Sequence, residues 1–375
     1  MTTVTSYPGV YIEELPSQSL SIANSSTAVP AIASSDAMIS VPTRIASWLE
    51  FMNIVSAFDP TKNLHLSVKT YFENGGGYCY VIPTGQLEQE VPKLDDVTLL
   101  VAAGEDIKTA ATTLCVDGKS LFAILDGPKV LQSPATDMSS YPVSEHAAAY
   151  SPWLDADWTE ASIPPSGAVA GAYCRVDRER GAWKAPANVA LNGGLRPQFK
   201  VSDATQGEYN AGKALNMIRE FQNNGTLIWG ARTLTSNTDT EWRYIPVRRL
   251  FNSAEKDIKN IMRSMASEPN NQASWVKAHG AIDNYLRALW RQGALRGQTA
   301  EEAYYVKVGE ETMTPDDIDN GKLIIKVGMA AVHPTEFIIL QFIQGGHPPE
   351  RHEATIAWCH PTIHKPSQPN SPGIL

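Results

Sequence analysis

Two apolar stretches near opposite ends of the chain have the composition of β-strands. Near the C-terminus, residues 337–340 (FIIL) are apolar without alternation and lie between Pro334 and a pair of glycines. An unbroken apolar run is typical of a strand that is covered on both faces. Near the N-terminus, residues 10–15 (VYIEEL) lie between Pro8-Gly9 and Pro16. Because the ends of a chain are usually exposed, we predict that both strands complete a sheet in a neighbouring copy of this chain.

The two predicted arm strands are separated from the rest of the chain by breakers, and the polar stretch 17–24 follows the first one as a linker. Composition alone leaves open the alternative that both strands pair within their own chain. The residues that carry the inter-subunit prediction are Val10, Tyr11, Ile12, Glu13, Leu15, Phe337, Ile338, Ile339, Leu340 and Phe342.

Helical and strand patterns alternate through the first half of the chain. Apolar residues recur at helical spacing over 45–55 and 64–73, and small residues predict a further helix from about residue 168. Such alternation is typical of an α/β layer with a largely parallel sheet. The predicted strands cover residues 28–33, 78–82, 97–102, 121–125 and 147–153.

The pattern changes after a charged and proline-broken stretch, 177–188, which we interpret as a hinge between domains. Beyond it we predict helices over 213–221, 254–266 and 273–292, and strands over 226–230, 242–250, 304–308 and 323–327. This order of elements indicates a helix-on-sheet domain. The last thirty residues are rich in proline, so we expect a loosely ordered tail.

Length and charge narrow the classes of protein. With 375 residues the chain is long enough for two domains. Its net charge of -9 argues against a general nucleic-acid binder, and its charged fraction of 19% suits a protein that is buried among partners. No apolar run approaches the roughly 20 residues that span a bilayer. The first ten residues lack a basic and an apolar segment, so we expect no secretory signal.

Motifs that would indicate enzyme chemistry are incomplete. Residues 117–120 (DGKS) end like a phosphate-binding loop, but Thr113 stands where the first glycine is needed. The glycines at 75–77 follow a helix and precede a strand, which is the reverse of a phosphate loop and favours a helix cap. Residues 317–321 place glycine one position too early for an EF-hand, and no GxSxG occurs. We therefore expect no catalytic residue and no cofactor.

Histidines crowd the tail and raise the question of a metal site. His360 and His364 have a spacing that zinc sites use, with Cys359 beside them, but no paired CxxC accompanies them. Solvated histidines in a flexible tail are the plainer interpretation, and we predict no metal. The four cysteines are far apart, so we expect buried thiols rather than disulfides.

The predicted helix 273–292 has a basic side opposite its apolar stripe. Lys277, Arg287 and Arg291 lie on this side together with Asn284. Such a line of charge could hold an acidic partner weakly, or it could be an ordinary solvated helix face.

Seven segments, taken in order, resemble contractile tail sheath proteins. The resemblance is closest to sheath subunits of extracellular contractile injection systems of the antifeeding-prophage and Photorhabdus-virulence-cassette type, and it extends more distantly to R-type pyocin and myophage sheaths. It covers nearly the whole chain up to about residue 345, but not the Pro- and His-rich tail. The segments are YPGVYIEE at 7–14, YFENGGGYCYV at 71–81, IPPSGAVAGAY at 163–173, RGAWKAPAN at 180–188, GTLIWGARTL at 225–234, YIPVRRLFN at 244–252 and EFIILQF at 336–342.

The resemblance implies a two-domain tail-sheath fold of mixed α/β and α+β class. An outer α/β insertion domain and an inner helix-on-sheet domain are completed by terminal strands exchanged between subunits. The expected divisions are an arm over 1–20, the outer domain over 21–188, the inner, tube-proximal domain over 189–334, an inter-subunit strand over 335–345 and a tail over 346–375.

The resemblance also implies a structural function. Subunits would form hexameric rings, stacked helically around an inner tube and metastable when extended, and contraction would drive the tube through a target membrane. The implied partners are further copies of the chain, the tube protein, and baseplate and terminal cap proteins, with no nucleic acid and no direct membrane insertion. It leaves open whether sister sheath subunits share the lattice. The particle would be assembled in the bacterial cytoplasm and act after release.

Two other classes of protein remain as alternatives. The first is an α/β nucleotide-dependent enzyme whose terminal strands pair internally. The second is a static shell or tube subunit, which would form assemblies of one fixed diameter. Micrographs of the expressed protein would separate tubes or stacked rings from discrete globules.

Overall fold

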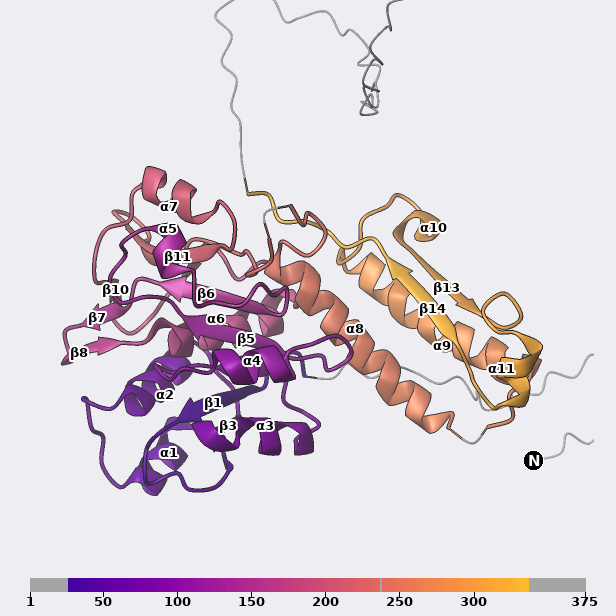
Figure 1. The fold of residues 1–375 in the computed structure, drawn as a ribbon, viewed down its shortest axis with the longest axis horizontal. Coiled ribbons are helices and arrows are strands. Elements are labelled where there is room, and N and C mark those ends of the chain that lie inside the picture. Colours follow the sequence, from indigo (N-terminus) through magenta and orange to yellow (C-terminus); the bar gives the residue numbers. More distant parts are fainter. Residues whose placement is uncertain (1–25, 237, 267, 337–375) are drawn as a thin grey trace, which may run out of the picture. The chain divides into compact units, whose positions relative to one another are not determined.

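A mixed nine-stranded sheet organises the first two thirds of the chain, as Figure 1 shows. The computed structural model describes residues 26–236, 238–266 and 268–336. Strands β3, β1, β4, β5, β6 and β11 run parallel to one another, as the alternating pattern predicted. In spatial order the strands are β2 (Thr43–Ile45), β3 (Cys79–Pro83), β1 (Pro30–Ser34), β4 (Leu99–Val101), β5 (Phe122–Asp126), β6 (Ala147–Ser151), β11 (Leu215–Phe221), β12 (Gly225–Ile228) and β9 (Val189–Ala190).

Both faces of this sheet are covered, which is why its central strands are apolar without alternation. Ile32 belongs to the apolar core on one face, whereas its neighbours Ala31 and Ala33 belong to the core on the other. The first core includes residues of α1 (Trp48–Val55), α2 (Asn63–Glu73) and α6 (Pro165–Arg180). The second includes residues of α3 (Leu87–Glu90), α4 (Lys108–Leu114) and α7 (Asp203–Tyr209).

Helices α2 and α6 pack closely because α6 presents glycines toward α2. A Cβ atom on Gly167 would lie 2.5 Å from the Ser67 carbonyl oxygen, and one on Gly171 would lie closer still to the Tyr71 carbonyl oxygen. The small-residue helix predicted from about residue 168 is therefore α6, and its composition is required by this contact.

Shorter elements complete this part of the chain. They are α5 (Pro134–Asp137), the 3-10 helices η1 (Thr84–Gln86) and η2 (Val91–Lys93), and a three-stranded sheet of β10 (Arg196–Pro197), β7 (Leu154–Ala156) and β8 (Thr159–Ile163).

A smaller layer follows, in which two long helices and a hairpin share a third apolar core. It consists of α8 (Ile245–Ser264), α9 (Gln272–Arg291), α10 (Ala300–Ala303), α11 (Pro315–Asp319) and the antiparallel pair β13 (Tyr304–Val308) and β14 (Ile325–Met329). The helix expected over 273–292 and the hairpin expected over 304–327 are present. We refer to β13 and β14 as the hairpin, and to the residues before α8 as the α/β body.

Two predicted elements have the wrong type. The expected helix over 213–221 is strand β11, because its apolar residues pack beside β6 on both faces of the sheet. The expected strand over 242–250 is the start of α8, because Pro246 lies in a first helical turn and Val247, Leu250 and Ala254 recur at helical spacing.

The sheet also changes how the chain is divided. Strands β9, β11 and β12 extend the sheet of the first half, so the boundary expected at residue 188 runs through the nine-stranded sheet. The hinge expected over 177–188 begins with Asp177–Arg180, which form the last turn of α6. The described residues up to Pro334 form one compact unit. The predicted arm strands at 10–15 and 337–342 and the histidine-rich tail lie outside the described residues.

No helix in the described ranges combines the length and apolarity that crossing a bilayer requires.

Candidate functional site

Two consecutive arginines of α8, Arg248 and Arg249, are buried and both contact the α/β body. Their side chains have exposed fractions of 2% and 3%. Since successive residues of a helix point about 100° apart, the two guanidinium groups reach different partners. α8 is thereby held to the body at two separate points.

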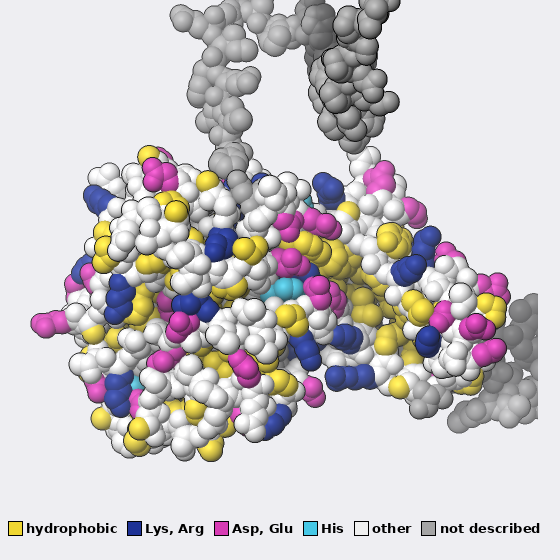
Figure 2. All heavy atoms as spheres, viewed as in Figure 1, with side chains coloured by type: hydrophobic (Ala, Val, Ile, Leu, Met, Phe, Trp, Pro, Cys, Tyr) yellow, Lys and Arg dark blue, Asp and Glu magenta, His cyan; other side chains and the backbone are white. Residues whose placement is uncertain are grey.

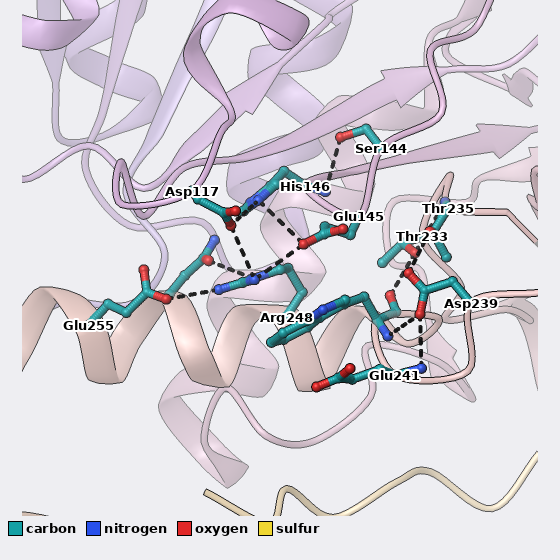
Figure 3. Close-up of polar contacts among 12 residues, drawn as sticks. Asp117, Ser144, Glu145, His146, Thr233, Thr235, Asp239, Glu241, Arg248 and Glu255 are labelled. Atoms are coloured by element: carbon teal, nitrogen blue, oxygen red, sulfur yellow. Dashed lines mark hydrogen bonds and ion pairs between the residues drawn. The ribbon is translucent and has the colours of Figure 1, made fainter. Parts of the chain in front are cut away.

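Arg248 lies at the centre of a polar group that we call the Arg248 cluster, drawn in Figure 3. Its Nε donates to Asn252 Oδ1 at 2.9 Å, and its Nη2 donates to Glu255 Oε1 at 3.1 Å, both within α8. Its Nη1 lies 3.5 Å from Oε1 of Glu145, which precedes β6, and 3.7 Å from Asp117 Oδ1. The guanidinium also stacks on the Trp242 ring, 4.2 Å from its centroid.

Burial shifts the titration of the groups around Arg248. It raises the pKa of Glu145, although the charge of Arg248 opposes that rise. It lowers the pKa of His146, and Arg248 lowers that pKa further. His146 is therefore neutral near pH 7, with its Nε2 3.2 Å from Asp117 Oδ1.

The same residues resemble a metal site, but the geometry argues against one. Asp117, Glu145 and His146 each place one ligand atom within 4.8 Å of the others. Arg248 Nη1 is close to oxygens of both carboxylates, so its guanidinium already supplies the positive charge that a cation would bring. The cluster joins α8 to the sheet instead.

Arg249 forms a bidentate ion pair with Asp177 of α6, which we call the Arg249 pair. The two Nη···Oδ distances are 2.9 and 2.5 Å, and both side chains are almost completely buried. Thr27 takes part through its hydroxyl, which donates to Asp177 at 2.5 Å, and through its carbonyl, which accepts from Arg249 at 3.1 Å. The pair thus joins α6, α8 and the start of the described chain.

The carboxyl edge of the parallel strands is where many α/β enzymes bind their ligands. Here β5 ends at Asp126, whose carboxylate accepts from the backbone N–H groups of Gly104 and Ser166 at 2.7 and 2.8 Å. The Ser166 hydroxyl donates to it at 2.9 Å. Burial raises the pKa of Asp126 to about 6, although these three hydrogen bonds oppose the rise. Both carboxylate oxygens are bonded to this chain, so Asp126 ties the β4–α4 turn to the start of α6.

On the basic side of α9, Arg287 and Arg291 are exposed and Lys277 is half-buried, and the three charges differ in their contacts. Arg287 lies 3.1 Å from Asp283, and Lys277 lies 4.0 Å from Glu268. Arg291 makes no ion pair with any residue that the structure describes. Arg291 is therefore the member of the line whose charge is most available to a partner.

The hairpin has two unpaired edges. β13 and β14 pair only with each other, and among the described residues no further strand joins either side. One face packs on α9, with Val306, Ile325 and Val327 half-buried, while Tyr305 on the other face is 54% exposed. An open strand edge presents backbone N–H and C=O groups to which another strand can add.

Comparisons with known proteins give the family. The model of the phage tail sheath C-terminal domain matches residues 237–344. A chain from the PVC sheath complex of an extracellular contractile injection system, in the contracted state, is 54% identical with a TM-score of 0.85. The alignment covers 92% of this chain and 99% of that chain. The chain belongs to the contractile tail sheath family.

Other sheath structures also resemble this chain. The helical sheath of the anti-feeding prophage in its contracted state is 41% identical, with a TM-score of 0.76 and coverage of 91% and 100%. The sheath tail protein from Desulfitobacterium hafniense shares the fold, with a TM-score of 0.57 at 9% identity and coverage of 86% and 100%. A curated protein, contactin-5 of Danio rerio, is 23% identical over 258 residues, 62% of this chain. The chain spans about a quarter (24%) of contactin-5, so that match is partial on both sides.

The predicted family, fold class and structural function are confirmed. Sheath proteins are structural, so this sheath protein is not an enzyme, and the alternative of a nucleotide-dependent enzyme is not supported. The relatives form sheaths of extracellular particles. The arm residues and the tube-facing role of α9 remain predictions.

The two buried arginines of α8 were not among the predicted site residues. Arg248 and Arg249 lie in a segment typical of sheaths, and Asp177 lies at the start of the expected hinge. A pair of arginines inside an otherwise apolar segment is a usable signal, because buried guanidinium groups require carboxylate partners elsewhere in the chain. Which carboxylates they meet could not be read from spacing.

Proposed function

We propose that this sheath protein assembles as hexameric rings stacked helically around an inner tube, and that contraction drives the tube through a target membrane. Its further partners in this proposal are baseplate and terminal cap proteins, and anti-feeding prophage baseplates include a similar chain. Assembly occurs in the bacterial cytoplasm, and the released particle acts outside the cell. The α/β body faces outward, and α9 with the hairpin lies near the tube.

The observation that carries the proposal is the hairpin with two open edges. A two-stranded sheet is marginal by itself, and added strands satisfy its edge groups and extend its apolar face. The sequence offers two suitable strands at its ends, residues 10–15 and 337–342. We therefore assign one edge to the N-terminal strand of one neighbour and the other edge to the C-terminal strand of another.

The size of these contacts suits a joint that survives contraction. A strand of about six residues forms a few hydrogen bonds, each with a net contribution of about 1 kcal/mol. Its apolar side chains add about 25 cal/mol for each Å² that they bury. Such joints can persist while whole subunits rotate, and the free energy for contraction is stored in the extended lattice without a nucleotide.

Subunits that move as nearly rigid bodies need firm internal contacts, and the Arg248 cluster and the Arg249 pair supply them. Both connect α8 to the α/β body through buried charge. Breaking a buried ion pair typically costs about 3–5 kcal/mol, which makes independent motion of α8 unfavourable. Motion then concentrates at the joints between subunits.

Deletion of residues 1–15 tests the arm strands. We expect the shortened sheath protein to fold with an unchanged melting temperature, because in this proposal those residues pair with a neighbouring copy and not with their own chain. It should not form long sheaths in negative-stain micrographs, because one edge of each hairpin then stays open.

The matched control is deletion of residues 346–375, which removes a longer segment but keeps residues 335–345. This variant should form sheaths of normal length. Long sheaths from the 1–15 deletion would contradict the arm assignment.

The exposed basic side of α9 is proposed to contact the tube. Exposed ion pairs contribute about 0–1 kcal/mol each, which suits a contact that must be released on contraction. The residues are Lys277, Arg287 and Arg291, and Arg291 has no ion-pair partner among the described residues.

Charge reversal tests this contact. Lys277→Glu, Arg287→Glu and Arg291→Glu together should reduce co-sedimentation of tube with sheath, with Arg291→Glu alone giving the largest single effect. Lys200→Glu, at an exposed position of the α/β body, is the control. Unchanged co-assembly of the triple variant with the tube would rule the contact out.

A further inference from the structure

A groove between α8 and the α/β body carries four positive charges, and we call it the basic groove. The cavity has a volume of about 510 Å³ and lies between α8, the η2 region and the α4–β5 loop. The cations are Lys119, Lys256, Lys259 and Arg263, with Glu88 and Asp95 as the acidic lining residues. Figure 2 shows dark blue side chains gathered beside α8.

None of these four cations forms an ion pair with a carboxylate of the described chain. Lys256 donates to the Asp96 backbone carbonyl at 3.0 Å, and Lys259 donates to that of Gly118. Lys119 and Arg263 are exposed, and their side chains form no hydrogen bond with any residue that the structure describes. The groove therefore has an excess of positive charge over its two acidic lining residues, and such an excess in a chain of net charge -9 points to an acidic partner.

The same chain presents an acidic surface elsewhere, which we call the acidic tip. It consists of Glu310, Glu311, Asp316 and Asp319, all exposed, in the turn after β13 and in α11. Within the part of the chain that the structure describes, Glu311 is the only one of these four with an ion-pair partner, Lys307 at 3.6 Å, and this pair is exposed. Magenta side chains over α11 mark this surface in Figure 2.

We propose that the acidic tip of one copy docks into the basic groove of a second copy. The groove and the tip are different surfaces, so the contact is heterologous. A heterologous contact builds a ring or a helical stack rather than a closed two-fold dimer. The helical sheath of the anti-feeding prophage is such an assembly, so the contact rests on the sheath function proposed above.

This contact would differ in kind from the arm joints. Charged surfaces steer association and fix orientation, and they weaken as salt rises. Strand addition depends on backbone hydrogen bonds and apolar burial, which salt screens little. The tip and groove would set the orientation of a subunit as it joins the lattice.

The test reverses charge at two exposed groove positions, Lys259→Glu with Arg263→Glu. The purified monomer should keep its melting temperature, and the protein concentration needed for sheath assembly should rise at least tenfold at low salt. Adding Glu310→Lys and Asp316→Lys in the same chain restores opposite charges across the contact and should return that concentration to near the original value. Lys200→Glu with Arg296→Glu changes net charge equally at exposed sites outside the groove and should have little effect.

Two results would overturn the inference. The first is unchanged assembly of the groove variant, and the second is loss of assembly that the tip reversal does not restore, because then the tip is not what the groove binds. The 1–15 deletion separates this contact from the arms, since it leaves all eight charges in place. If that deletion assembles normally while the groove variant does not, the arm proposal fails and this inference stands.

Discussion

The α/β body and the hairpin layer bury their strands to very different degrees. All five residues of β1 and of β6 are buried, whereas no residue of β14 is and only Tyr304 of β13 is. Helices cover both faces of the large sheet, but α9 covers one face of the hairpin. The body therefore completes its own core, while the hairpin keeps edges and a face that other chains can complete.

The two regions also differ in whether their charged side chains are buried or exposed. The body is joined to α8 by the buried Arg249 pair, whereas Arg291 of α9 and the tip carboxylates Glu310, Asp316 and Asp319 are exposed and form no ion pair within the described residues. Buried pairs hold a structure in one arrangement, and exposed charges are available to partners. The buried pairs therefore hold α8 to the body, and the exposed charges of the hairpin layer are available to partners.

The largest expected effect that tests this contrast is removal of a buried partner. Asp177→Ala leaves Arg249 buried without a counter-charge and should lower the free energy of unfolding by about 3–5 kcal/mol in urea titrations. The control is Asp157→Ala, which breaks the exposed pair with Arg196 and should change stability little. Equal effects of the two substitutions would show that burial does not distinguish them.

A smaller effect comes from one substitution made in both regions. Val101→Ala, at a fully buried position of β4, should cost about 2–3 kcal/mol of unfolding free energy. Val306→Ala, at a half-buried position of β13, should cost about 1 kcal/mol in the monomer. If the hairpin gains cover in the sheath, that second cost should rise when thermal stability is measured on assembled particles.

The smallest effect concerns pH and a histidine of the body. His65 Nδ1 accepts from the Asp59 backbone N–H at 3.0 Å, its Nε2 lies 3.2 Å from Asp36, and burial lowers its pKa. Because the pKa of His65 is lower in the folded protein, its contribution to the free energy of unfolding is fully present above the ordinary pKa near 6.5. That contribution declines as pH falls below this value. Urea titrations at pH 7.5 and 5.5 should show a loss that is smaller in His65→Gln than in the wild type.

Asp126 has the opposite effect on the pH dependence of stability, because burial raises its pKa to about 6. Its contribution to the free energy of unfolding therefore becomes more favourable as pH falls through that value. Both proteins contain Asp126, and it cancels when they are compared. His279→Gln, at an exposed position, serves as the control and should behave like the wild type. An equal pH-dependent loss in His65→Gln would exclude a role for His65.

Much of this fold could be predicted because its strongest signals are local. Unbroken apolar runs located β1, β5 and β6, because these strands are covered on both faces, and the period-3.6 pattern located α9. Alternation of apolar and polar residues located the hairpin, because one of its faces is covered. The family could be predicted from seven short segments. The candidate surfaces were partly predictable: the basic side of α9 follows from helical spacing alone.

The sequence by itself determined the periodic elements, the sheath relationship and the absence of complete catalytic motifs. Only the tertiary structure decided that residues 215–221 form a strand, because that segment is apolar enough for either element and β6 supplies its backbone partners. It also decided that Arg249 meets Asp177, 72 residues away, and that Lys119 joins Lys259 in one groove. Long-range pairs of charges depend on where the folded chain brings side chains together, and no local pattern encodes that distance.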